Sequence, residues 1–95
     1  MLQIWWEPAV ILGLLERVSE ERLRAAILEL TADRRSICPS DAARVVGGEG
    51  WRELMDQARE VARTLANDGE VVITQRGQEL DPNATWRGPI RIRAR

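Results

Sequence analysis

The order of elements predicted in the second half of this chain constrains its fold more than any other feature. Ile37-Cys38 suits only a bridge-like strand, because the Pro39 that follows has no backbone N–H for further pairing. Ser40 stands where an N-cap is expected, so a short helix is predicted from Asp41 to about Val46. Gly47-Gly48 ends this helix, since glycine takes the left-handed conformation of a helix C-terminus without penalty.

A long amphipathic helix is predicted next, from about Gly50 to Asn67, with Gly69 closing it. Its apolar residues recur at the i, i+3, i+4 and i+7 positions, which line one side of a helix. They are Trp51, Leu54, Met55, Ala58, Val61, Ala62 and Leu65.

A β-ribbon completes the predicted order. Val71–Thr74 is a strand by composition, and residues 75–78 form a turn in which Gly77 supplies a positive φ. Asp81-Pro82-Asn83 is a second turn. Further on, Ile90 and Ile92 alternate with arginines, the pattern of a strand with one buried face.

This order is typical of a winged helix-turn-helix. We therefore expect an α+β, mainly α, fold, in which a three-helix core carries a small β-ribbon wing and an extra N-terminal helical segment. Such an architecture favours a binding module over an enzyme.

The N-terminal segment, residues 1–19, stands apart from a domain expected over residues 20–95. Pro8 suits the first turn of a helix, and an apolar stripe follows it and ends at Val18. Ser19-Glu20-Glu21 has the character of a new helix start, and the next apolar residue, Leu23, is out of phase with the stripe. We favour two helices here over one long helix whose apolar face swings round.

Two roles are open for the N-terminal apolar residues. They either cap the core of the domain or pair with a second copy of the chain, and the size of the stripe favours a homodimer, because an exposed stripe of this kind is unusual in a monomer. The predicted dimerisation residues are Trp5, Trp6, Val10, Ile11, Leu14, Leu15 and Val18.

Charge is unevenly spread over the 95 residues, which suffice for one domain. The net charge of −1 argues against a protein that coats nucleic acid without specificity. All 14 basic residues are arginine, and those after residue 69 outnumber the acids there, whereas acids outnumber arginines between residues 36 and 68. Any basic surface is therefore expected on the C-terminal ribbon.

Catalytic and metal chemistry find no support in the composition. The chain has no His, Lys or Tyr, and its single cysteine, Cys38, allows neither a disulfide nor a zinc set. No phosphate-binding glycine loop or catalytic triad is recognisable, so we expect no enzyme, cofactor or metal. The apolar run Ala9–Leu15 is too short to span a bilayer, and no secretory signal precedes it, which favours the cytoplasm and no membrane association.

Several motifs together resemble a small bacterial family that is catalogued as a domain of unknown function with a winged-helix-like fold. The resemblance covers residues 25–93 and implies the fold and a bacterial source, but no activity. The motifs are Ile37-Cys38-Pro39-Ser40-Asp41-Ala42-Ala43-Arg44, Trp51-Arg52-Glu53-Leu54-Met55, Ile73-Thr74-Gln75-Arg76-Gly77, Asp81-Pro82 and Gly88-Pro89-Ile90-Arg91-Ile92-Arg93.

Double-stranded DNA is the predicted partner, and the long helix is one candidate for contacting it. At its N-terminal end Arg52 could read guanine and Gln57 adenine, with Arg44 close by. The competing interpretation is a solvated face of balanced charge that includes Arg59. On it Arg52 and Asp56 would form an i, i+4 pair, and Glu60 and Arg63 an i, i+3 pair.

The ribbon is the second candidate. Its arginines are unopposed locally and could sit on phosphates or enter a minor groove, or they could only keep an edge strand soluble. These residues are Arg76, Arg87, Arg91 and Arg93.

The alternative function is a protein-interaction module without a nucleic-acid role. Trp51 is expected to anchor the core rather than stack on bases, whereas Trp86 could pack back across the sheet or project as a contact residue. Cys38 is expected to behave as a small buried hydrophobe.

Overall fold

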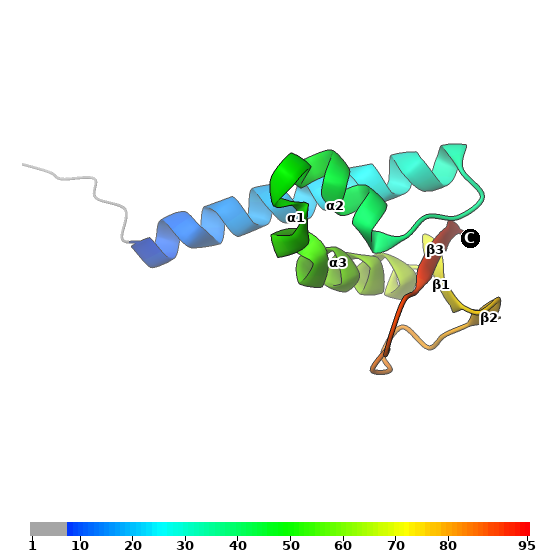
Figure 1. The fold of residues 1–95 in the computed structure, drawn as a ribbon. Coiled ribbons are helices and arrows are strands. Elements are labelled where there is room, and N and C mark those ends of the chain that lie inside the picture. Colours follow the sequence, from blue (N-terminus) through cyan, green and yellow to red (C-terminus); the bar gives the residue numbers. More distant parts are fainter. Residues whose placement is uncertain (1–7) are drawn as a thin grey trace, which may run out of the picture.

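A computed structural model describes the backbone of residues 8–95 and the side chains from residue 17 onwards. Three helices lie together, and a small antiparallel sheet closes one end of the group (Figure 1). The elements are α1 (Pro8–Asp33), α2 (Pro39–Gly47), the 3₁₀ helix η1 (Gly48–Leu54), α3 (Met55–Asn67), β1 (Val71–Gln75), β2 (Gln78–Glu79) and β3 (Arg91–Ala94).

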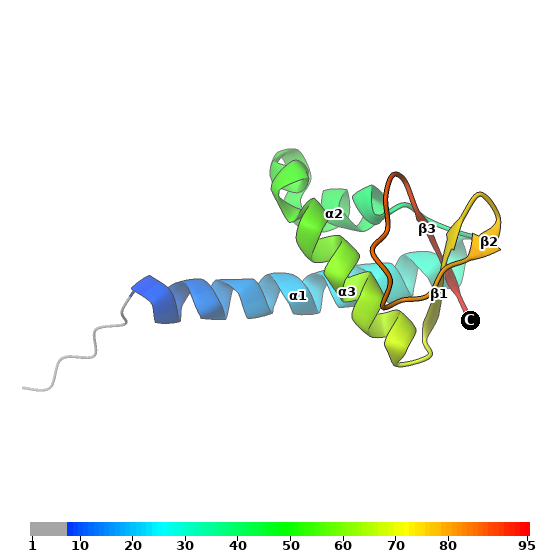
Figure 2. The same ribbon diagram turned by 90° about the horizontal axis from the view of Figure 1, so that it is seen from below.

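Helix α1 is a single helix, so the prediction of two helices with a break at Ser19 is wrong. Ser19-Glu20-Glu21 can cap a helix, but it contains neither glycine nor proline, and the continuous hydrogen-bond ladder overrides a modest capping preference. The first half of α1 projects away from the other elements, while its second half lies along α2 and α3 (Figure 2).

Helix α2 begins two residues earlier than predicted, and its N-cap is Cys38 rather than Ser40. Pro39 occupies the first helical position, where its fixed φ is already helical and its missing N–H costs nothing. The Asp41 carboxylate accepts a hydrogen bond from the Cys38 N–H at 2.9 Å, as in a capping box. The predicted end of the helix is confirmed, because Gly48 follows as the C-cap with a φ of 56°.

The long helix predicted from Gly50 starts as a 3₁₀ segment and becomes α-helical only at Met55. Gly48 and Gly50 weaken helix formation here, and Gly50 departs from helical geometry with φ −86° and ψ 15°. Trp51 and Leu54 still pack against the core from this segment, so the predicted apolar face is confirmed. The segment is, however, a 3₁₀ helix and not the predicted α-helix.

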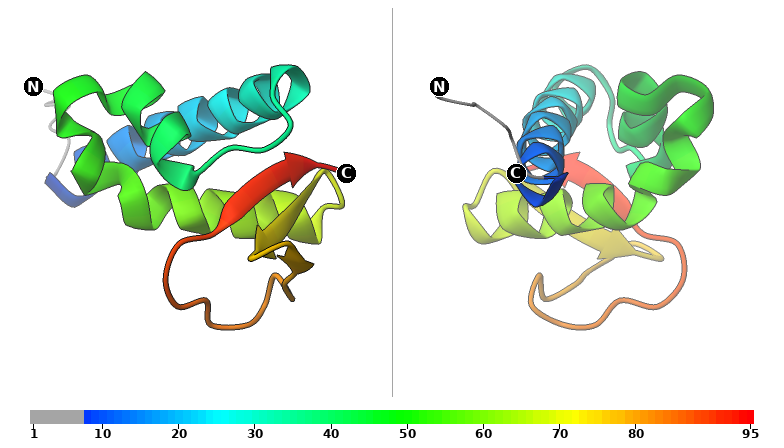
Figure 3. Two further views of the ribbon diagram at one scale, coloured as in Figure 1. Left: turned by 45° about the vertical axis from the view of Figure 1, so that its right-hand side comes forward. Right: turned by 90° about the vertical axis from the view of Figure 1, so that its left-hand side faces the viewer.

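The predicted ribbon is confirmed. Its strands form an antiparallel sheet in the order β2-β1-β3 (Figure 3). Ile73 of β1 pairs with Ile92 of β3. The β1–β2 turn has two residues with positive φ, Arg76 at 52° and Gly77 at 82°, as in a type I′ hairpin. Ile37 adds the expected bridge on the far side of β3, with two backbone hydrogen bonds to Ile92 of 2.8 and 2.7 Å.

One hydrophobic core joins all these elements. It combines Leu23 and Ile27 of α1 with residues of α2, α3 and the sheet, and the predicted alternation in β3 is confirmed, because Ile90 and Ile92 are buried while Arg91 is exposed. The fold is therefore α+β, mainly helical, and compatible with a winged-helix-like architecture.

Candidate nucleic-acid interface

A groove of about 510 Å³, which we call the ribbon groove, lies where β1 ends and β3 begins. Its charged lining residues are all arginines: Arg76 from the hairpin turn, Arg87 from the loop before β3, and Arg91 from β3 itself. The other residues that line it are Cys38, Gln75, Gly88, Pro89 and Ile90. The groove thus brings three of the four predicted ribbon arginines together without a carboxylate among its lining residues.

Arg91 is anchored by several hydrogen bonds on one wall of this groove. Its guanidinium donates to the Ser36 hydroxyl at 3.1 and 2.9 Å and to the Ser36 carbonyl at 3.0 Å. It also lies 2.8 Å from the Cys38 sulfur. These contacts tie the start of β3 to the segment before α2. Cys38 itself is only half-buried, so the expectation of a fully buried cysteine is wrong.

Arg76, Arg87 and Arg93 are exposed, and within the described residues their guanidinium groups form no ion pair or hydrogen bond. Arg93 shares the outer face of β3 with Arg91, because alternate residues of a strand point to the same side. The groove therefore combines one anchored guanidinium with two that remain free to contact a ligand, and Arg93 lies further along the same strand face.

A second hollow, of about 280 Å³, extends the groove toward the start of α3. The two hollows share Cys38, Gly88, Pro89 and Ile90. At its other end the second hollow reaches Ser40 of α2 and Met55 at the first turn of α3. The two hollows therefore share a wall, and between them they extend from the β1–β2 turn to the first turn of α3.

Arg59 and Arg63 do not lie on a free helix face, contrary to the prediction. Arg59 donates to the carbonyls of Trp86 and Gly88 at 3.2 and 3.3 Å. Arg63 donates to the carbonyls of Pro82 and Ala84. The sequence pattern does not reveal these contacts, because they join α3 to a loop about 20 to 30 positions away and no local pattern encodes them.

Trp86 explains why both arginines turn toward this loop. Its side chain is buried in the core, and its indole N–H donates to the Asp81 carbonyl at 2.9 Å. The guanidinium carbons of Arg63 and Arg59 lie 4.2 and 5.9 Å from the ring centroid, within the range of cation–π attraction. Trp86 therefore packs inward, and the two alternatives left open by the sequence are resolved.

The N-terminal end of the long helix carries mixed charge. Arg44 and Arg52 both lie over the ring of Trp51, at 4.4 and 4.6 Å from its centroid, and Trp51 is half-buried against the core. Gln57 is half-buried as well. Exposed carboxylates surround this end, and among the ion pairs foreseen on the helix the described residues show only Glu60–Arg63, at 3.3 Å. The exposed acids are Glu49, Glu53, Asp56 and Glu60.

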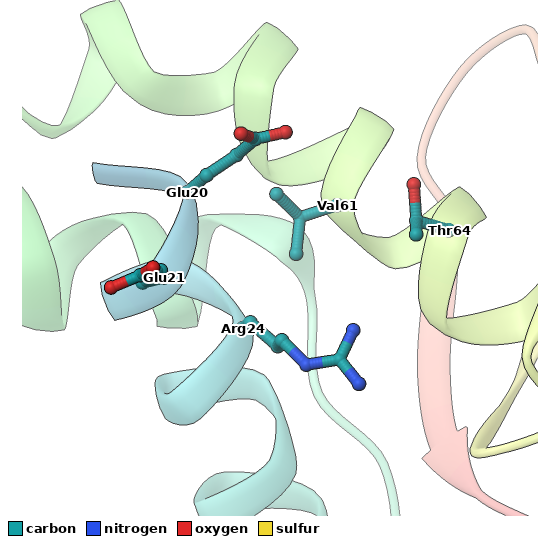
Figure 4. Close-up of a pocket in the computed structure, with 5 residues that line it drawn as sticks. All are labelled: Glu20, Glu21, Arg24, Val61 and Thr64. Atoms are coloured by element: carbon teal, nitrogen blue, oxygen red, sulfur yellow. The ribbon is translucent and has the colours of Figure 1, made fainter. Parts of the chain in front are cut away.

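A smaller cavity of about 170 Å³ lies between α1 and α3 (Figure 4). It is lined by Glu20, Glu21 and Arg24 of α1 and by Val61 and Thr64 of α3. The Arg24 guanidinium is already paired with Glu70 at 2.9 Å and with Asp68 at 3.6 Å. The Arg24 side chain that lines this cavity is therefore not free to bind an anion, and the ribbon groove is the stronger candidate for a nucleic-acid site.

Of the predicted dimerisation residues, only Val18 has a side chain that the structure describes. Trp5 and Trp6 lie outside the described residues, and the side chains of Val10, Ile11, Leu14 and Leu15 do as well. Val18 is described, and its side chain is 46% exposed.

Fold and groove together define a small α+β domain in which a helical core positions an arginine-lined β-ribbon. The chain belongs to the family DUF3253, described as "Protein of unknown function", whose sequence model matches residues 20–95. This match confirms the resemblance to a small family of unknown function. A comparison with curated proteins found no match.

Two further properties of the described residues bear on partners. No group of three or more Cys, Asp or Glu side chains in residues 17–95 is placed to hold a metal ion. Among residues 8–95 no helix combines the length and the apolar character needed to cross a bilayer.

Proposed function

We propose that this protein is a cytoplasmic DNA-binding module, without enzymatic activity, that holds the backbone of double-stranded DNA in its ribbon groove. The observation that carries the proposal is the all-arginine charge of that groove, contributed by Arg76, Arg87 and Arg91 in a chain whose net charge is −1. Concentrated positive charge on a protein of negative net charge is suited to a ligand with regularly spaced negative charges.

Arginine is the appropriate residue for this task. Its planar guanidinium can donate two parallel hydrogen bonds to one phosphate, which lysine cannot do. Arg91 is already oriented by Ser36, so binding would cost little of its side-chain entropy. Arg76 and Arg87 would supply the remaining contacts, and Arg93 would extend them along β3.

Base reading would fall to the segment that leads into α3, because the second hollow reaches the first turn of that helix at Met55. Arg52, positioned over Trp51 beside Arg44, would reach a guanine edge in the major groove. The neighbouring carboxylates oppose phosphate, so this end of the helix would have to face bases rather than the backbone. Half-buried Gln57 is the weaker of the two base-reading candidates.

The test is a titration of a fluorescently labelled random-sequence duplex, followed by anisotropy at low and at near-physiological salt. Phosphate contacts predict binding that weakens steeply as salt rises, because released counterions drive association. Arg87→Ala should weaken binding, while Arg17→Ala, which removes the same charge from an exposed site on α1, should not. Absence of binding at low salt would overturn the proposal.

A protein-interaction module remains the second candidate, and one observation favours it. The exposed residues at the start of the long helix include four carboxylates, which suit a basic protein surface better than DNA. This candidate predicts no duplex binding at any salt concentration, together with capture of a partner that is lost when Glu53 and Asp56 are replaced by lysine.

A further inference from the structure

Helix α1 carries two apolar faces that point in different directions. Leu23, Ile27 and Thr31 follow one another at four-residue steps and are buried against the domain core. The last residue of the N-terminal stripe, Val18, precedes Leu23 by five residues, which turns the helix face by about 140°. Because α1 is one continuous helix, the domain core cannot cover both faces.

The second face continues along the whole of α1 with a regular spacing. Ile11, Leu15 and Val18 are separated by steps of four and three residues. Arg22, Ala25 and Glu29 continue the series after Val18 with steps of four, three and four. Alternating steps of three and four are the spacing of a coiled-coil seam. The described members of this seam are all exposed, from Val18 to Glu29.

In the second half of α1 the seam becomes one wall of a groove against α2. This groove measures about 250 Å³, and it is lined by Arg22, Ala25, Ala26 and Glu29 of α1 and by Val45 and Val46 of α2. Val45 is 65% exposed, and it and Val18 are the two large hydrophobic side chains found exposed among residues 17–95. The apolar stripe and the apolar groove thus lie along the same line of one helix.

We propose that a second copy of this chain covers this face, with the two α1 helices antiparallel and crossing near Val18. Ile11 and Ala25 are each seven residues from Val18, about 10.5 Å along the helix in either direction. A crossing at Val18 therefore places the apolar stripe of each copy against the α1–α2 groove of the other. The same patch serves on both copies, as two-fold symmetry requires.

This arrangement also accounts for the projection of α1. Its first half extends beyond the domain and lies against none of the other described elements (Figure 2). An isolated helical segment of this length is marginal in water, so a partner helix would stabilise it. The ribbon groove does not include any residue of α1, so the dimer and the proposed DNA contact use separate surfaces.

Sedimentation velocity of the full chain over a concentration series tests the proposal. The wild type is expected to reach twice the chain mass, and Leu15→Glu and Val45→Glu are each expected to sediment as folded monomers. Arg17→Glu changes charge on α1 outside the seam and is expected to remain a dimer. Val45 is exposed, so its variant keeps the test decisive even if Leu15→Glu were to fold poorly.

Disulfide trapping then determines whether the two α1 helices of the dimer are antiparallel. With Cys38→Ser in every chain, an Ile11→Cys chain and an Ala25→Cys chain should link to each other when mixed, and neither should link to itself. A wild type that stays monomeric at all concentrations would overturn the dimer. A dimer unaffected by Val45→Glu, or an Ile11→Cys chain that links to itself, would overturn this interface.

Discussion

Gln75 fixes the position of Arg87 at the mouth of the ribbon groove. The Gln75 side-chain amide donates to the Arg87 carbonyl at 2.6 Å and to the Pro89 carbonyl at 3.0 Å. Gln75 is the last residue of β1, so these two bonds hold the loop that carries Arg87 against the sheet. The arginines of the groove therefore owe part of their arrangement to an uncharged neighbour.

Gln75→Ala is expected to weaken duplex binding although it removes no charge. Each lost hydrogen bond contributes about 0.5–1.5 kcal/mol to holding the loop, and a mobile Arg87 must be ordered on binding. Anisotropy titrations should show a lower affinity with an unchanged dependence on salt, since the number of phosphate contacts stays the same. An affinity equal to that of the wild type would show that the loop needs no such support.

Arg76→Asn is expected to stabilise the fold while weakening DNA binding. Arg76 has a φ of 52°, a left-handed conformation that asparagine tolerates better, and Asn-Gly is a preferred pair in a type I′ turn. A gain of about 0.5–1 kcal/mol should appear in urea denaturation. Arg76→Ala is the matched control: it should lose the same binding without gaining stability, and equal stabilities of the two variants would contradict the argument.

Trp86→Ala is expected to lower the free energy of unfolding by about 3–5 kcal/mol, because it empties a buried site and removes the ring beneath Arg63. Trp86→Phe should cost less, since it keeps a buried ring and chiefly removes one of the two donors to the Asp81 carbonyl, which still accepts from the Ala84 N–H. Chemical denaturation measures both. The adjacent Arg87→Ala should stay within about 0.5 kcal/mol of the wild type, as is usual for an exposed residue.

Asp41→Ala is expected to destabilise the protein by about 1 kcal/mol, since it removes the carboxylate that accepts from the Cys38 N–H at the start of α2. Ser40→Ala tests the position that the sequence indicated as the cap. It should change stability little, because the N-cap lies at Cys38. Thermal unfolding of the two variants side by side distinguishes them, and a larger loss for Ser40→Ala would contradict the observed capping.

Local patterns were sufficient to predict much of this fold. The alternation around Ile90 and Ile92, the Gly77 turn and the Ile37 bridge each depend on residues close in sequence or on steric rules for single residues. The sequence predicted a basic surface on the ribbon from the charge of its arginines. It did not predict that Arg76, Arg87 and Arg91 line one groove.

The failures have a common physical cause, which is competition from distant packing. Ser19-Glu20-Glu21 looked like a helix start because capping is a local preference, but α1 is continuous. Arg59 and Arg63 were expected on a solvated helix face, and Arg63 does pair with the nearby Glu60. Both arginines also donate to loop carbonyls and lie over the Trp86 ring. Neither outcome is encoded within a few residues of the positions concerned.

The salt dependence of duplex binding tests the central claim most directly. The slope of log affinity against log salt concentration should be compared for the wild type, for Arg76→Ala with Arg87→Ala, and for Arg17→Ala with Arg34→Ala. The last pair removes the same charge from exposed sites outside the groove. If the groove holds phosphates, the slope falls by about 2 in the groove variant alone. Equal slopes in all three proteins would contradict the assignment of the groove as the DNA-binding site.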